Sequence, residues 1–225
     1  MRGSALRRGL RRTLRGLLIA SGAASAACGG PDLSLFEEPR CSPSGRNTPA
    51  LDGVRAAIPV DYVELRVYPD YAAAAPADVL AQIGTPCEKA SHQSACIAAL
   101  VALRSGIGVR ADCGTFCTFY YFAATQGDKI SAINSKEEFA AYLGPIDAQQ
   151  EALWVAWAAG YDFVCGDRSR GAVRAVPGGY ELIALRSAGC GADLYQTELL
   201  VNGNGALTEH SAQRIGQSEA CQPGP

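Results

Sequence analysis

Histidine is scarce in this chain, since His92 and His210 are the only two among 225 residues. Hydrolases of the Ser-His-Asp or Cys-His type hold a histidine beside the nucleophile, and zinc sites often draw on histidine as well. Both histidines stand among polar residues, which predicts that they are surface side chains. A Gly-x-Ser-x-Gly turn and a phosphate loop with its lysine are also absent. The sequence therefore disfavours an enzymatic function, and it predicts no catalytic residue, no metal ligand and no cofactor.

Long apolar runs are missing too, because no stretch reaches the roughly 18 apolar residues that a membrane-spanning helix needs. Residues 1–15 contain six arginines and no acidic residue, and residues 16–24 are small or apolar. A basic start followed by a short apolar run and small residues is typical of an export signal. At ~1.5 Å per residue this run is too short to span a membrane. We expect residues 1–27 to be cleaved from the mature protein.

The end of this signal is the segment Ser25-Ala26-Ala27-Cys28-Gly29-Gly30. It resembles the lipobox of bacterial lipoproteins, which are cleaved before a cysteine and acylated on it. The resemblance implies that Cys28 is the first mature residue and that acyl chains on it, palmitate among them, hold the protein at the membrane. Enteric lipoproteins that stay in the inner membrane have Asp at the position of Gly29. The resemblance thus implies the bacterial cell envelope, at the outer membrane.

Two other interpretations of the N-terminus stay open. An ordinary secretory signal cleaved after Ala24 or Ala27 would leave Cys28 free or disulfide-bonded. The pair Arg11-Arg12 resembles the start of a twin-arginine export signal. Each alternative still sends the remainder of the chain out of the cytoplasm.

The charge of the mature chain differs from that of the whole sequence. Cleavage after residue 27 removes six of 20 basic residues and none of 22 acidic ones, which leaves 14 against 22 and a net charge of −8. An acidic surface repels phosphate backbones, so nucleic acid is not expected as a partner. A protein or small-molecule partner is left open.

Eight cysteines remain when Cys28 is set aside. They are Cys41, Cys87, Cys96, Cys113, Cys117, Cys165, Cys190 and Cys221. An even number in an exported chain indicates disulfides, here four. The short loop between Cys87 and Cys96 favours that pair, and Cys165 and Cys190 flank one predicted hairpin, which favours theirs.

The closely spaced Cys113 and Cys117 could also form a redox pair or half of a metal site. Thioredoxin-like motifs have two residues between their cysteines at the start of a helix, whereas three residues separate these two ahead of a predicted strand. Zinc sites need four ligands, and no histidine lies near in the sequence. A structural disulfide is the preferred interpretation.

The mature chain divides into a tether and one domain. Residues 28–57 contain four prolines with glycine and serine and show little apolar periodicity, which predicts a flexible tether. Residues 58–225 are long enough for a single domain with a sizeable core.

The hydrophobic patterns within residues 58–225 predict mixed secondary structure. The expected strands are residues 62–68, 116–124, 129–133, 161–165, 172–176, 180–187, 195–201 and 206–215. The expected helices are residues 76–83, 91–103, 135–143 and 147–159. Helices followed by a run of hairpins favour an α+β fold, with an antiparallel sheet of hairpins, helices packed on one face, and disulfide staples.

Individual side chains in these elements can be assigned to faces. In the first strand Val63 and Leu65 are expected to face the core, with Glu64 and Arg66 outward. Ser135 and Glu138 form a capping box, and Asp147-Ala148-Gln149-Gln150 repeats the pattern at the next helix. Aromatic residues at helical spacing usually belong to the core, so Trp154 and Trp157 are expected there rather than at a ligand or partner surface.

From Leu143 onward the chain resembles a scattered group of uncharacterised bacterial envelope proteins. The shared features are the run Leu143-Gly144-Pro145-Ile146-Asp147 before an alanine-rich helix and the segment from Gly171 to Glu181. Caps and turns explain both features, so the resemblance implies no functional residue. The leading hypothesis is a non-enzymatic envelope lipoprotein with a binding or structural role. The alternatives are a periplasmic or surface hydrolase and a lipoprotein that binds a small ligand or peptide.

Overall fold

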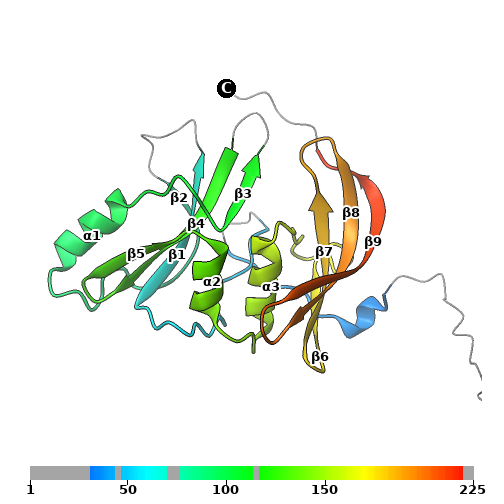
Figure 1. Cartoon of the computed structure of the whole chain (residues 1–225), viewed down its shortest axis with the longest axis horizontal. Coiled ribbons are helices and arrows are strands. Elements are labelled where there is room, and N and C mark those ends of the chain that lie inside the picture. The colour runs from blue at the N-terminus through cyan, green and yellow to red at the C-terminus, as the bar shows by residue number, and fades with distance from the viewer. Residues whose placement is uncertain (1–30, 44–46, 70–76, 114–116, 220–225) are drawn as a thin grey trace, which may run out of the picture. The chain divides into compact units, whose positions relative to one another are not determined.

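The computed structural model describes residues 31–43, 47–69, 77–113 and 117–219, and those from Asp32 onward belong to one compact unit. The described residues form an α+β fold in which three helices pack on two antiparallel sheets (Figure 1). The predicted fold class is therefore confirmed. The signal, the lipidation site Cys28 and Cys221 lie outside the described residues.

The first sheet has the strand order β2-β1-β4-β3, and β5 also pairs with β4. Its strands are β1 (Tyr62–Pro69), β2 (Asp78–Gly84), β3 (Arg110–Cys113), β4 (Cys117–Gln126) and β5 (Lys129–Ile133). Val63 and Leu65 of β1 are fully buried in the main core, as their alternation predicts. The tight turn after Gln126 joins β4 to β5 as a hairpin.

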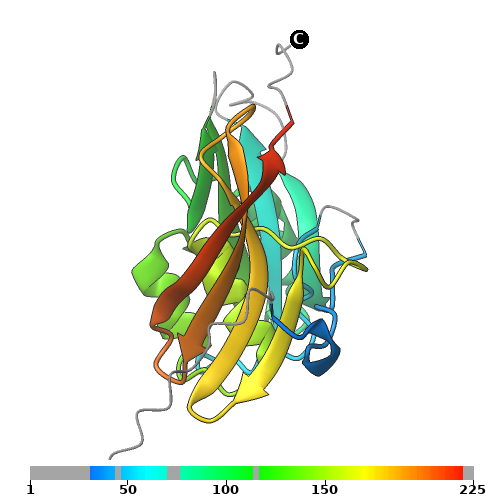
Figure 2. The same cartoon turned by 90° about the vertical axis from the view of Figure 1, so that its right-hand side faces the viewer.

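The second sheet is a meander in which each strand pairs with the next, and Figure 2 shows its face. Its strands are β6 (Ala172–Val176), β7 (Gly179–Ser187), β8 (Asp193–Asn202) and β9 (Leu207–Gln217). Gly178 has φ 90° in the turn between β6 and β7, and Gly205 has φ 76° before β9. Both turns need the left-handed backbone that glycine adopts without strain.

The helices are α1 (Gln93–Ala102), α2 (Lys136–Leu143) and α3 (Gln149–Ala158). Helix α3 lies between the two sheets (Figure 1) and contacts β6, β7 and β8. On its other side the Trp154 ring packs edge-on against Phe122 of β4, with 5.3 Å between ring centroids. Trp154 and Trp157 are buried, so the core interpretation of these aromatics is confirmed. Helix α1 instead covers the opposite face of the first sheet, where Leu100 packs with Tyr62 and Ala123.

Two predicted elements differ from the structure. Residues 76–83 were expected to be helical, but Asp78–Gly84 forms strand β2, because the open edge of β1 offers a full ladder of backbone partners. Helix propensity is a weak preference that such pairing overrides. Residues 161–165 make only one bridge, in which the backbone groups of Asp162 and Leu185 exchange two hydrogen bonds of 2.8 Å.

Residues 32–43 and 47–57, which the composition predicts to belong to a flexible tether, pack on the domain. Phe36 and Leu51 are buried, and Leu51 belongs to the main core. The side chains of Gln150 and Trp154 on α3 both donate to the carbonyl oxygen of Ala50, at 2.8 and 2.9 Å. The described part of this segment forms only a 3₁₀ turn at Leu33–Leu35 and two isolated β-bridges, but helix side chains satisfy its backbone equally well.

The start of α3 is capped by Glu151 and not by Asp147. The Glu151 carboxylate is fully buried and accepts hydrogen bonds from the backbone N–H groups of Asp147 and Ala148, at 2.9 and 3.0 Å. It also accepts from the backbone N–H of Arg55 at 2.7 Å. Asp147 lies one residue too early for capping, because Ala148 is the N-cap residue. At α2 the predicted cap is confirmed, since Ser135 accepts from the backbone of Glu138.

The disulfides confirm one predicted pair and correct another. Three bridges join described cysteines, namely Cys41–Cys165, Cys87–Cys96 and Cys113–Cys117. The predicted Cys165–Cys190 pair is wrong, because the N-terminal segment brings Cys41 to Cys165 across a sequence separation of 124. Cys190 is also disulfide-bonded. Disulfides persist in oxidising compartments, so the domain belongs outside the cytoplasm.

Candidate functional site

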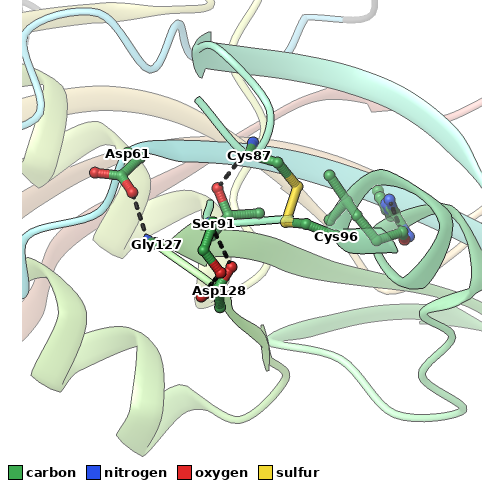
Figure 3. Close-up of a disulfide and its surroundings, with 9 residues drawn as sticks. Asp61, Cys87, Ser91, Cys96, Gly127 and Asp128 are labelled. Atoms are coloured by element: carbon green, nitrogen blue, oxygen red, sulfur yellow. Dashed lines mark hydrogen bonds between the residues drawn. A yellow bond between two sulfur atoms is a disulfide. The ribbon is translucent and has the colours of Figure 1, made fainter. Parts of the chain in front are cut away.

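The two histidines are exposed side chains on different elements. His92 precedes α1 and makes no side-chain capping bond, and His210 lies in β9. Ser91, beside His92, donates its hydroxyl to Asp128 at 2.6 Å, so its proton is directed to a carboxylate (Figure 3). A nucleophilic serine would donate to the histidine instead. The geometry here is that of a loop clamp, which joins the start of α1 to the β4–β5 turn.

This clamp leads to a prediction about acid stability. The side chain and backbone of Ser91 both donate to Asp128, and these bonds lower the pKa of the Asp128 carboxyl. A lowered folded-state pKa contributes stability above the unfolded value of about 3.9, and that contribution is lost as pH falls through the folded value. We expect NMR titration to place the pKa of Asp128 below its usual range and Ser91→Ala to raise it. An unchanged pKa in Ser91→Ala would refute the clamp.

A cavity with mainly apolar walls lies between α2, α3 and the β8–β9 turn, and we call it the α2–α3 groove. Its volume is about 280 Å³. Its apolar walls include Phe139, Leu143, Ile146, Val155, Ala158 and Leu207. Binding sites for small molecules are typically concave and apolar with a few polar groups. None of these residues was identified as a site from the sequence, because each has the side-chain type of an ordinary core position.

Small residues leave this groove open. Ala140 and Ala159 line it from the two helices, and Gly144 and Gly205 line it from the turns that follow α2 and β8. A Cβ atom at Gly205 would stand 3.7 Å from the Ile146 side chain. Larger side chains at Ala140 and Ala159 would occupy the space that a ligand needs.

The tip of the β8–β9 hairpin is fixed against the helices. The backbone N–H of Ile146 donates to the carbonyl oxygen of Gly203 at 2.9 Å. Within the turn the Asn202 side chain accepts from the backbone N–H groups of Asn204 and Ala206, at 2.9 and 3.0 Å. The wall that the hairpin supplies is therefore already formed, which lowers the entropic cost of binding.

Lys136 is the charged residue that lines the α2–α3 groove, and it is exposed at the first position of α2. It makes no ion pair within the part of the chain that the structure describes. The neighbouring Glu138 is engaged by the backbone N–H of Asn134 at 2.9 Å. The groove thus combines apolar walls with one available cation at its rim.

A second notable cluster is a buried ion pair beneath α1. Glu64 and Arg66 were expected to face solvent, but both are buried, because α1 covers that face of β1. The Arg66 guanidinium donates to Glu64 and to the carbonyl oxygens of Leu100 and Leu103, which end α1. Burial, together with the hydrogen bond to Glu64, raises the pKa of the Tyr62 hydroxyl, which therefore stays protonated as a donor. This network fixes α1 to the sheet.

Another polar cluster joins the two sheets. Arg110 of β3 pairs with Asp112 and with Asp162, both at 2.9 Å, and its guanidinium lies 5.1 Å from the centre of the Trp157 ring. Burial raises the pKa of the nearby Tyr120 hydroxyl to about 12, so this hydroxyl stays neutral at physiological pH. The pairing of Asp162 with Arg110 gives this carboxylate a structural role.

No metal centre emerges from the described ranges, where no three His, Cys, Asp or Glu side chains are grouped to hold an ion. No helix within those ranges has the length and apolarity needed to cross a membrane. Comparisons of the chain with protein-family models, with curated proteins and with solved structures gave no match.

Proposed function

We propose that this protein is a lipid-anchored binding protein of the bacterial cell envelope whose α2–α3 groove takes a small anionic amphiphile. The export signal and the lipobox resemblance at Cys28 support the anchor. The disulfides support an oxidising compartment. The proposal is non-enzymatic, because Ser91, which precedes His92, donates its hydroxyl to Asp128 and not to the histidine.

The observation that carries this proposal is the apolar groove with Lys136 at its rim, a cation that makes no ion pair with any residue the structure describes. Apolar surface contributes about 25 cal/mol per Å² removed from water, so the walls would bind an alkyl chain. An exposed ion pair contributes only about 0.2–1 kcal/mol. Lys136 would therefore select the orientation and charge of the ligand, while most of the affinity would come from the apolar tail.

Titration with decanoate and with decanol tests the groove. We expect Ala140→Leu to weaken decanoate binding by about tenfold or more, because the new side chain fills the groove. Ala141→Leu is the matched control, since Ala141 is exposed on the same helix and does not line the groove. Calorimetry on the full chain carrying Cys28→Ser, which cannot be acylated, supplies the affinities. Equal affinities in the two leucine variants would contradict the proposal.

The charge at the rim has its own test. Lys136→Met is expected to weaken decanoate binding about two- to fivefold and to leave decanol binding unchanged, because only the carboxylate meets the ammonium group. The same calorimetric titrations measure both ligands. A parallel loss for decanoate and decanol would show that Lys136 acts by packing and not by charge.

The lipid anchor is tested by Cys28→Ser in the exporting bacterium. We expect the variant to leave the membrane fraction, because without the thiol no acyl chain can be attached and several chains are needed for firm anchoring. Phase partition in detergent measures this, and globomycin should block processing of the unaltered chain. A Cys28→Ser protein that still enters the detergent phase would end the lipoprotein interpretation.

A further inference from the structure

Helix α1 has an apolar surface that the described residues leave uncovered. Eight of its ten residues are apolar, yet Cys96 and Leu100 are the ones that are buried. A helix that is apolar on all sides is normally enclosed by protein. Ile97 and Val101 are 41% and 59% exposed on the flank that faces β2, where Val79 is 42% exposed. Large apolar side chains gathered in this way mark an interaction surface.

These side chains border a cavity of about 270 Å³, which we call the α1–β2 groove. Its rim consists of Val79, Pro86, Ile97, Val101 and Arg104. The floor holds the Glu64–Arg66 pair, whose charges are matched within the chain. The groove therefore offers apolar contact and shape, with a paired charge in its floor and the charge of Arg104 at its rim.

The surface is rigid before any partner arrives. The Cys87–Cys96 disulfide holds the turn after β2 against the first half of α1, with 5.9 Å between the Cα atoms (Figure 3). Arg66 holds the other end of α1 through the carbonyl oxygens of Leu100 and Leu103. A helix fixed at both ends loses little entropy when it docks.

Two opposite charges lie near the two halves of α1, and neither has an ion-pair partner among the described residues. Arg104 follows the C-terminal end of α1 and donates to the carbonyl oxygens of Val101 and Leu103. Glu88 is exposed in the turn that the disulfide holds beside Cys96. A cation on the rim of the groove thus follows the C-terminal end of α1, and an anion lies in the turn beside its first half, so two antiparallel copies are complementary in charge.

We infer that the α1–β2 groove binds a second copy of this chain, with the two α1 helices antiparallel about a two-fold axis. When Ile97 of one copy lies opposite Val101 of the other, Arg104 of each copy points toward the first half of the facing helix. Glu88 of that facing copy lies beside the same half of its helix. An isologous interface of this kind uses the same patch twice. Because α1 is only ~15 Å long, the interface is small and the dimer is weak. A net charge of −8 on the mature chain makes an anionic lipid surface the poorer occupant.

Sedimentation of the full chain carrying Cys28→Ser tests this inference. We expect the mass to rise from monomer to dimer with concentration, and Val101→Lys to weaken the dimer by about tenfold or more. Ala99→Lys is the matched control, because Ala99 is exposed on the same helix outside the groove. Ile97→Lys should reproduce the loss. A monomer at all concentrations, or a dimer that survives both groove substitutions, would overturn the inference.

Charge reversal distinguishes a second copy of the chain from other occupants of the α1–β2 groove. Arg104→Glu is expected to weaken the dimer about three- to tenfold, and Arg104→Glu with Glu88→Arg in the same chain to restore it, since each pair forms again between copies. If the double variant does not regain the dimer, the antiparallel arrangement is contradicted. Binding to phosphatidylglycerol vesicles by a chain that stays monomeric would assign the surface to a membrane and overturn the proposal.

Discussion

Replacing both Cys41 and Cys165 by serine is expected to lower the free energy of unfolding by about 5 kcal/mol. The bridge has a sequence separation of 124, and the entropy that a cross-link removes from the unfolded chain grows with the logarithm of the loop. The bridge also ties the N-terminal segment to the domain, so its loss should expose Phe36 and Leu51, which are buried in the native structure. Urea unfolding measured under oxidising conditions gives the difference.

The bridge at the end of the β3–β4 hairpin supplies the control. Cys113 and Cys117 have a separation of only 4, so replacing both by serine is expected to lower the free energy of unfolding by about 2 kcal/mol. The remaining bridges stay intact in each variant. Equal losses in the two double-serine variants would show that the long bridge does not act through loop closure.

The second large effect is expected at the ion pair beneath α1. Arg66→Met should lower the free energy of unfolding by about 3–5 kcal/mol, because it leaves the Glu64 carboxylate buried without its partner. It also removes two donors from the carbonyl oxygens of Leu100 and Leu103. Thermal and urea unfolding measure the loss, and amide hydrogen exchange should show that α1 opens first.

Two comparisons isolate the charge. The double variant Glu64→Gln with Arg66→Met should lose less free energy of unfolding than Arg66→Met alone, because no uncompensated charge stays buried. Arg174→Met removes a similar pair with Glu181, but that pair is about 30% exposed and its loss should cost at most about 1 kcal/mol. If Arg66→Met and Arg174→Met both lowered the free energy of unfolding by about 1 kcal/mol or less, the buried network would not be what fixes α1.

The elements that local chemistry determines were predicted well. Strands β5 and β6 match their predicted ranges, because glycine turns and alternating side chains define both ends of each hairpin. The Ser135 cap and the Cys87–Cys96 pair also followed from short sequence separations. Such features depend on neighbours in the chain, and the sequence displays those neighbours directly.

Features that depend on distant segments were not predicted. Asp78–Gly84 forms a strand because β1 offers an open edge, and side chains of α3, about 100 residues later, hold the backbone at Ala50. Glu64 and Arg66 were assigned to solvent because alternation identifies faces but does not reveal that a helix covers the second face. The α2–α3 groove arises where two helices and a hairpin meet, so no pattern within a single stretch of sequence predicts it.

An amide NMR spectrum of the full chain carrying Cys28→Ser, titrated with decanoate, tests the proposed function most directly. The α2–α3 groove predicts shifts that saturate at Phe139, Leu143 and Val155 and at the β8–β9 turn, with none of them in the Ala140→Leu variant. Shifts confined to other surfaces, or an unchanged spectrum at millimolar decanoate, would contradict a binding role for this groove.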